Sequence, residues 1–114
     1  MLARDKRLRA EQDWARLFRD GLGVSGQLLT LVALSTPGKR RVGFSVGRKV
    51  GNAVKRNLVK RRLRSAVLNA WDQLPEADMA LIAKPALVEV DFATVEETLR
   101  GLSRRLLADK RWRG

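Results

Sequence analysis

The sequence predicts an α+β fold in which helices pack on one small sheet, in the order α-β-β-α-β-α. Three observations predict it. Apolar residues recur every three or four positions in three segments, which is the spacing of amphipathic helices. Short apolar runs bounded by Gly and Pro lie between them and are typical of strands. The 114 residues suit a single domain, 1–114.

The first predicted helix carries an aromatic pair. Residues 1–9 are basic and are expected to form a flexible N-terminal segment. The helix then runs from about residue 10 to residue 19, because Trp14, Leu17 and Phe18 fall on one face. The glycines that follow end it. Periodicity alone leaves the aromatic pair open, since it can belong to the core or stack unpaired bases at the surface.

Two strands are predicted next. Residues 28–34 form the first, residues 36–38 form a turn, and residues 42–46 form the second. One face of the second strand carries only small residues, such as Gly43 and Ser45. Another element or a ligand is therefore expected to approach the backbone closely on that face.

The C-terminal third predicts a strand and a helix. Residues 79–83 form a short apolar strand, and residues 92–108 form a helix capped either by Asp91 or by a Thr94–Glu97 capping box. The residues of its predicted buried stripe are spaced alternately three and four positions apart. It consists of Phe92, Val95, Leu99, Leu102 and Leu106.

Charge is distributed unevenly along the chain. Lys and Arg number 24 against 12 Asp and Glu, which gives a net charge of +12. Residues 21–71 contain no acidic residue, so a polyanion such as RNA, DNA or an anionic membrane surface is the expected partner. The cations of this stretch are Lys39, Arg40, Arg41, Arg48, Lys49, Lys55, Arg56, Lys60, Arg61, Arg62 and Arg64.

Several function classes are excluded by residues that the sequence lacks. The absence of Cys and His removes disulfides, the usual zinc sites and the commonest general base. No apolar run approaches the roughly 18 residues of a membrane span, so we expect a cytoplasmic protein with no membrane partner. The glycine-bounded loop 47–51 lacks the ending of a nucleotide-binding P-loop, and no organic cofactor is expected.

The predicted central helix is basic on one side. It is capped by Asn52 and ends near Trp71. At about 100° per residue, its apolar residues form a core stripe. Its opposite face gathers Asn57, Lys60, Arg61 and Arg64. No carboxylate on the helix pairs with these cations, so a polyanion is expected to supply the counter-charge. The helix-turn-helix arrangement that reads DNA is absent, and DNA is not expected.

The basic region resembles the signature of the bacterial ribonuclease P protein subunit. The matching segments are residues 43–46 (GFSV), 49–54 (KVGNAV), 56–57 (RN) and 60–64 (KRRLR). The flanking helices and strands are similar to those of the family as well, so the resemblance covers nearly the whole chain.

The resemblance implies a function. In this family a large RNA is the catalyst, and the protein is an accessory subunit without catalytic residues or a metal site of its own. Together they hydrolyse the 5′ leader from precursor tRNA, leaving a 5′-phosphate on the tRNA, with Mg²⁺ held mainly by the RNA. A structural protein that binds ribosomal RNA is the alternative reading, because composition alone does not separate the two.

The resemblance also implies site residues and one topological detail. The surface for the catalytic RNA would comprise Arg48, Lys49, Asn52, Lys55, Arg56, Asn57, Lys60, Arg61 and Arg64. The leader cleft would comprise Trp14, Phe18, Val32 and Lys49. The fold would be that of the second domain of ribosomal protein S5, with a left-handed crossover where base rates favour right-handed ones. Leu58 and Val32 depart from the family, which often has Arg and an aromatic residue at these positions.

Overall fold

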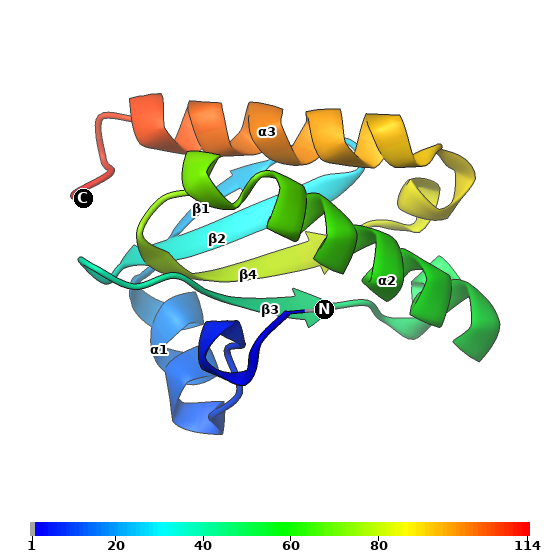
Figure 1. Cartoon of the computed structure of the whole chain (residues 1–114), viewed down its shortest axis with the longest axis horizontal. Helices are drawn as coiled ribbons and strands as arrows, with labels where there is room; N and C mark the ends of the chain where they lie inside the picture. Colours follow the sequence, from blue (N-terminus) through cyan, green and yellow to red (C-terminus); the bar gives the residue numbers. More distant parts are fainter. Residues whose placement is uncertain (1) are drawn as a thin grey trace.

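Residues 2–114, the part of the chain that the computed structural model describes, form a four-stranded sheet and three α-helices (Figure 1). The helices are α1 (Glu11–Asp20), α2 (Ala53–Asn69) and α3 (Phe92–Ala108). The strands are β1 (Leu22–Ser25), β2 (Leu29–Ser35), β3 (Arg41–Ser45) and β4 (Ala77–Ala83). The predicted α+β class is confirmed, and every predicted helix and strand is present. β1 is an additional strand that the sequence pattern did not indicate.

The sheet is mixed, with the strand order β1-β2-β4-β3. β2 is antiparallel to both β1 and β4, whereas β3 and β4 are parallel and are connected through α2. In Figure 1 both parallel strands point to the right, β4 lies above β3, and α2 passes in front of them. This arrangement makes the β3–α2–β4 crossover left-handed, as the family resemblance implied.

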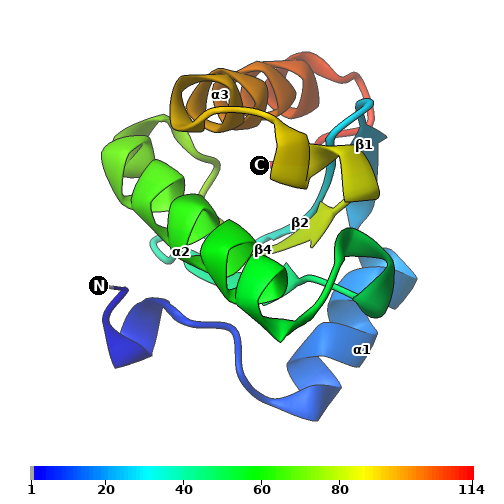
Figure 2. The ribbon, with the colours of Figure 1, turned by 90° about the vertical axis from the view of Figure 1, so that its right-hand side faces the viewer.

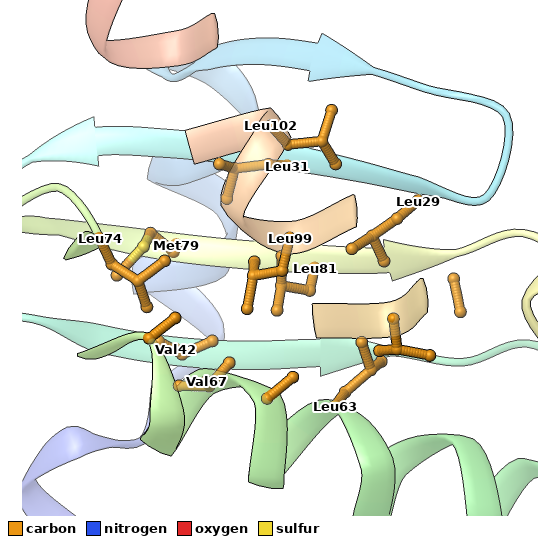
Figure 3. Packing of buried hydrophobic residues seen from close by; sticks show 14 of the residues in the cluster. Leu29, Leu31, Val42, Leu63, Val67, Leu74, Met79, Leu81, Leu99 and Leu102 are labelled. Atoms are coloured by element: carbon orange, nitrogen blue, oxygen red, sulfur yellow. The ribbon is translucent and has the colours of Figure 1, made fainter. Parts of the chain in front are cut away.

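The main core lies between one face of the sheet and the two long helices. Figure 2 shows α2 and α3 on one side of the sheet and α1 on the other. Figure 3 shows Leu31 of β2 and Leu81 of β4 facing Leu99 of α3, with Val67 of α2 beside Val42 of β3. The predicted stripes are confirmed, since Val59, Leu63, Ala66, Val67 and Ala70 of α2 are all buried. Of the five residues in the predicted stripe of α3, only Phe92 is partly exposed.

Polar caps fix where the long helices begin. The Asn52 side chain accepts a hydrogen bond from the Lys55 backbone N–H at 3.0 Å, as the sequence predicts. Of the two caps predicted for α3, the structure forms the Asp91 cap. The Asp91 side chain accepts a hydrogen bond from the Thr94 backbone N–H at 2.9 Å. No helix among residues 2–114 combines the length and the hydropathy that a membrane crossing requires.

The N-terminal segment is packed against the fold. The composition of residues 1–9 predicts a flexible segment, but residues 2–9 run along the exposed edge of β3 (Figures 1 and 2), and residue 1 lies outside the described residues. The prediction was wrong for 2–9 because Leu2 and Leu8 are buried. In addition, the Leu8 backbone N–H donates to the Val42 carbonyl at 3.1 Å. We call residues 2–9 the N-terminal strap.

Candidate nucleic-acid interface

The outer face of α2 carries cations that have no acidic partner among residues 2–114. Asn57 and Arg61 are exposed, and Lys60 and Arg64 are half-buried. Within residues 2–114, the ion pairs involve only cations elsewhere in the chain. Like charges one turn apart repel each other on a helix, so this face favours a polyanionic ligand that supplies the counter-charge.

The loop before α2 extends this basic surface. It forms a short 3-10 helix, Arg48–Val50, whose Arg48 and Lys49 side chains are exposed. Gly51 then takes a φ of +151°, a conformation that favours glycine. Its carbonyl accepts a hydrogen bond from the Arg56 guanidinium at 3.1 Å. Arg56 therefore shapes the turn into α2, while the first two cations lie free at the surface.

The nine residues predicted for the catalytic RNA are close together along the chain. They occupy one continuous stretch, from the 3-10 helix to the fourth turn of α2. Arg62, which was not in that set, has a structural contact instead, because it donates to the Val90 carbonyl at 3.0 Å. Leu58 is half-buried beside Arg61 and Phe92, so no cation occupies that position.

The aromatic pair lies on the opposite side of the sheet. The Trp14 and Phe18 rings stack with centroids 5.8 Å apart and planes inclined by 25°. Phe18 is 51% exposed, so it is not a core residue, whereas Trp14 is half-buried and its indole N–H donates to the Leu8 carbonyl at 3.3 Å. The core position between them belongs to Leu17, which is fully buried.

Trp14 makes the close approach to the backbone that the small residues of β3 predict. Its ring lies directly over the Gly43 backbone, where a Cβ atom would come within 2.2 Å of the Trp14 Cζ2 atom. Only glycine therefore leaves room for this ring. The predicted close approach on the small-residue face is confirmed, and the element that approaches is α1.

The face of the sheet on the α1 side consists of rows of paired residues. Val32 of β2, Ala80 of β4 and Gly43 of β3 form one row, which α1 covers. Thr30, Ile82 and Ser45 form the next row and remain half-exposed. Lys49 follows β3 beyond this open row, whereas α1 lies toward the start of β3 (Figure 1). Trp14, Phe18 and Val32 therefore lie together on the α1 side of the sheet, and Lys49 is separated from them by the open row.

An ion-pair network centred on the buried Asp78 links α1 to the sheet, and sequence reasoning missed it. Asp78 of β4 is 1% exposed and binds Arg41 of β3 through two hydrogen bonds of 2.9 and 2.8 Å. From α1, Asp13 lies 3.3 Å from Arg41, and Arg16 lies 3.6 Å from Asp78. Hydrogen bonding to Asp78 raises the pKa of Arg41 above its ordinary value. The one available signal was that any acidic partner of Arg41 had to come from outside residues 21–71.

The side chains of this surface are poor ligands for a metal ion. The α2 face offers guanidinium, ammonium and amide groups, whereas Mg²⁺ prefers carboxylate oxygens. Throughout residues 2–114, His, Cys, Asp and Glu do not gather in groups of three or more that could hold a metal ion.

Comparisons with known proteins agree on one family. The family model described as Ribonuclease P matches residues 2–107. The ribonuclease P protein component of Streptococcus equi subsp. equi is 34% identical over 94 residues, which cover 82% of this chain and 79% of that protein. Its Streptococcus pyogenes counterpart is 32% identical with the same coverage.

Solved structures give the same result at the level of the fold. The RNase P protein from Thermotoga maritima superposes with a TM-score of 0.79 at 30% identity, covering 87% of this chain and 96% of that one. The Staphylococcus aureus RNase P protein, at 22% identity and a TM-score of 0.79, shares the fold, with 88% of this chain and 94% of that one covered. The ribosomal alternative gains no support from these relatives. Because the family model spans nearly the whole sequence, this chain belongs to the bacterial ribonuclease P protein family.

Proposed function

We propose that this chain is the protein subunit of ribonuclease P and assists a catalytic RNA in removing the 5′ leader from precursor tRNA. The observation that carries the proposal is the face of α2 with Asn57, Lys60, Arg61 and Arg64, whose cations form no ion pair within residues 2–114 in a chain of this family. Such a face binds a phosphate backbone and releases its counterions. This role places the complex in the cytoplasm, where bacterial precursor tRNA is made.

The two sides of the sheet bind different RNAs. The cations of α2 and of the preceding 3-10 helix bind the backbone of the catalytic RNA. On the opposite side, the open strip between α1 and Lys49 holds the single-stranded leader. Phe18 supports this assignment because an exposed ring beside a stacked Trp offers a surface for an unpaired base. Val32 borders the same strip without an aromatic ring, so the stacking surface here comes from α1.

The protein contributes binding and orientation, whereas the chemistry belongs to the RNA. Hydrolysis leaves a 5′-phosphate on the tRNA and a 3′-hydroxyl on the leader. Mg²⁺ can supply charge stabilisation to such a reaction. The cations and amides of α2 do not fit an Mg²⁺ site, so we place the ion mainly on RNA phosphates. By lowering repulsion between RNA strands and by holding the leader, the protein reduces the Mg²⁺ concentration that cleavage requires.

Reconstitution tests this function. Cleavage of the leader from precursor tRNA is measured at low Mg²⁺ with the cognate RNA alone, the protein alone, and both together. We expect cleavage to rise when the protein joins the RNA and to be absent with the protein alone. No gain over the RNA alone would refute the proposed function, and cleavage by the protein alone would indicate a protein nuclease.

A further inference from the structure

A pocket lies where the N-terminal strap crosses the edge of β3. Its volume is about 350 Å³, which falls within the size range of ligand sites, and it opens beside α2. The strap, α1, β3 and α2 all contribute to it. The lining residues that carry the argument are Leu8, Trp14 and Phe44, together with the cations Arg7, Arg9 and Arg64.

The floor of this pocket is apolar and partly aromatic. Leu2, Leu8 and Val42 are at least 95% buried, and the rings of Trp14 and Phe44 complete the lining. Trp14 is fixed in place by its hydrogen bond to the Leu8 carbonyl and by the ring's seat over the Gly43 backbone. A flat, rigid, apolar group is the ligand that such a floor accommodates best, because it stacks without reordering the walls.

The rim of the pocket is cationic. Arg7 and Arg9 of the strap are exposed, and Arg64 of α2 is half-buried. The lining includes no acidic residue. The best ligand therefore combines a flat apolar part with a negative charge, which is the chemistry of a nucleotide.

The position of Arg64 indicates which RNA supplies the nucleotide. Arg64 lines this pocket and also belongs to the α2 face to which we assign the catalytic RNA. The open strip assigned to the leader lies on the α1 side of the sheet, and of the four predicted leader residues Trp14 alone also lines the pocket. We propose that the pocket holds one unpaired nucleotide of the catalytic RNA, with its base against the Phe44 ring and its phosphate against Arg9 and Arg64. This inference rests on the proposed function of the α2 face.

Site-directed crosslinking tests the proposal, and the absence of native Cys makes the label unique. The variant Arg9→Cys carries an azidophenacyl group at the rim of the pocket. Glu97→Cys, at an exposed position of α3, is the matched control. Each labelled chain is irradiated with the catalytic RNA, with precursor tRNA, and with both, and the crosslinked nucleotide is mapped.

We expect the Arg9→Cys chain, but not the control, to crosslink to one unpaired nucleotide of the catalytic RNA. Removing the base of that nucleotide should weaken protein binding about tenfold, within the range for one stacked base. Removing the base should cost much less affinity when the protein carries Phe44→Ala or Arg9→Ala, because each variant already lacks part of the site. Two variants are needed, since Phe44 packs partly against the core whereas Arg9 is exposed.

Three outcomes would overturn the proposal. They are crosslinks only to the leader, crosslinks equal to those of the control, or an abasic RNA that binds as tightly as the intact RNA. Cleavage stimulation by the unmodified protein is measured in parallel at low Mg²⁺. Stimulation without the crosslink would refute the pocket alone, whereas a lack of stimulation would refute the subunit role itself.

Discussion

Removing the Asp78 carboxylate should loosen α1 from the sheet. Asp78 is 1% exposed and receives two hydrogen bonds from Arg41, so Asp78→Asn or Asp78→Ala leaves a guanidinium without its main partner. Breaking a fully buried pair costs about 3–5 kcal/mol. Because the Arg41 side chain is 29% exposed and keeps Asp13 at 3.3 Å, we expect about 2–3 kcal/mol here.

The assay is urea unfolding followed by far-UV circular dichroism. With an m-value of about 1.5 kcal/mol/M, that loss lowers the midpoint by about 1–2 M. Asp20→Asn is the matched control, since it also removes one carboxylate that pairs with an Arg. Its pair with Arg19 is exposed, so water and salt screen it and the midpoint should move little. Equal shifts for the two variants would refute the idea that the buried network holds α1.

Other predictions concern RNA binding and pH. Arg61→Ala and Arg64→Ala should each weaken binding of the catalytic RNA about tenfold and reduce the slope of log K against log[salt] by about 0.7–0.9; unchanged slopes in a salt titration would contradict the phosphate contacts. Phe18→Ala should lower the preference for leader-bearing over mature tRNA by about 1–3 kcal/mol if its ring stacks one base, and Trp14→Ala should lower it by removing the ring that supports Phe18; competition binding measures this, and an equal loss for both tRNAs would contradict the leader assignment. Hydrogen bonds from the Thr94 side chain and backbone, aided by the Arg62 charge, lower the pKa of Asp91. Because the folded chain holds this proton less tightly than the unfolded chain, the stabilisation is complete above the ordinary value of 3.8 and is lost as pH falls through the folded pKa. Acid unfolding should therefore be shallower in Asp91→Asn than in the parent, and identical curves would exclude this contribution.

The helices were predictable because their evidence is periodic and local. The core stripe of α2 follows from spacing alone, and Asn52 marks where that helix begins. β1 was not predictable, since two of its four residues are Gly and Ser and its formation depends on pairing with β2. The N-terminal strap was mispredicted because its cations dominate its composition, whereas it is held by two buried leucines, Leu2 and Leu8, and by the hydrogen bond to Val42.

The candidate site, too, was predictable only where its evidence is local in sequence. The motif around α2 predicted the residues for the catalytic RNA within one segment, 48–64, and the structure folds that segment into a 3-10 helix followed by α2. The environment of Trp14 depends on contacts with Leu8 and Gly43, one of which is distant in sequence, so periodicity left its role open. The Asp78–Arg41 pair spans 37 residues, and no local pattern marks such a partnership.

The placement of α1 and α2 on opposite faces of one sheet has a geometric consequence. If α2 is seated on the catalytic RNA and α1 borders the leader strip, the thickness of the sheet fixes how far the leader lies from the RNA surface. The molecule then acts as a spacer of constant width, because the closely packed strands between the two helices resist compression. Substitutions that shift α1, such as Asp78→Asn or Gly43→Ala, would change that width and thereby the stretch of leader that the protein contacts.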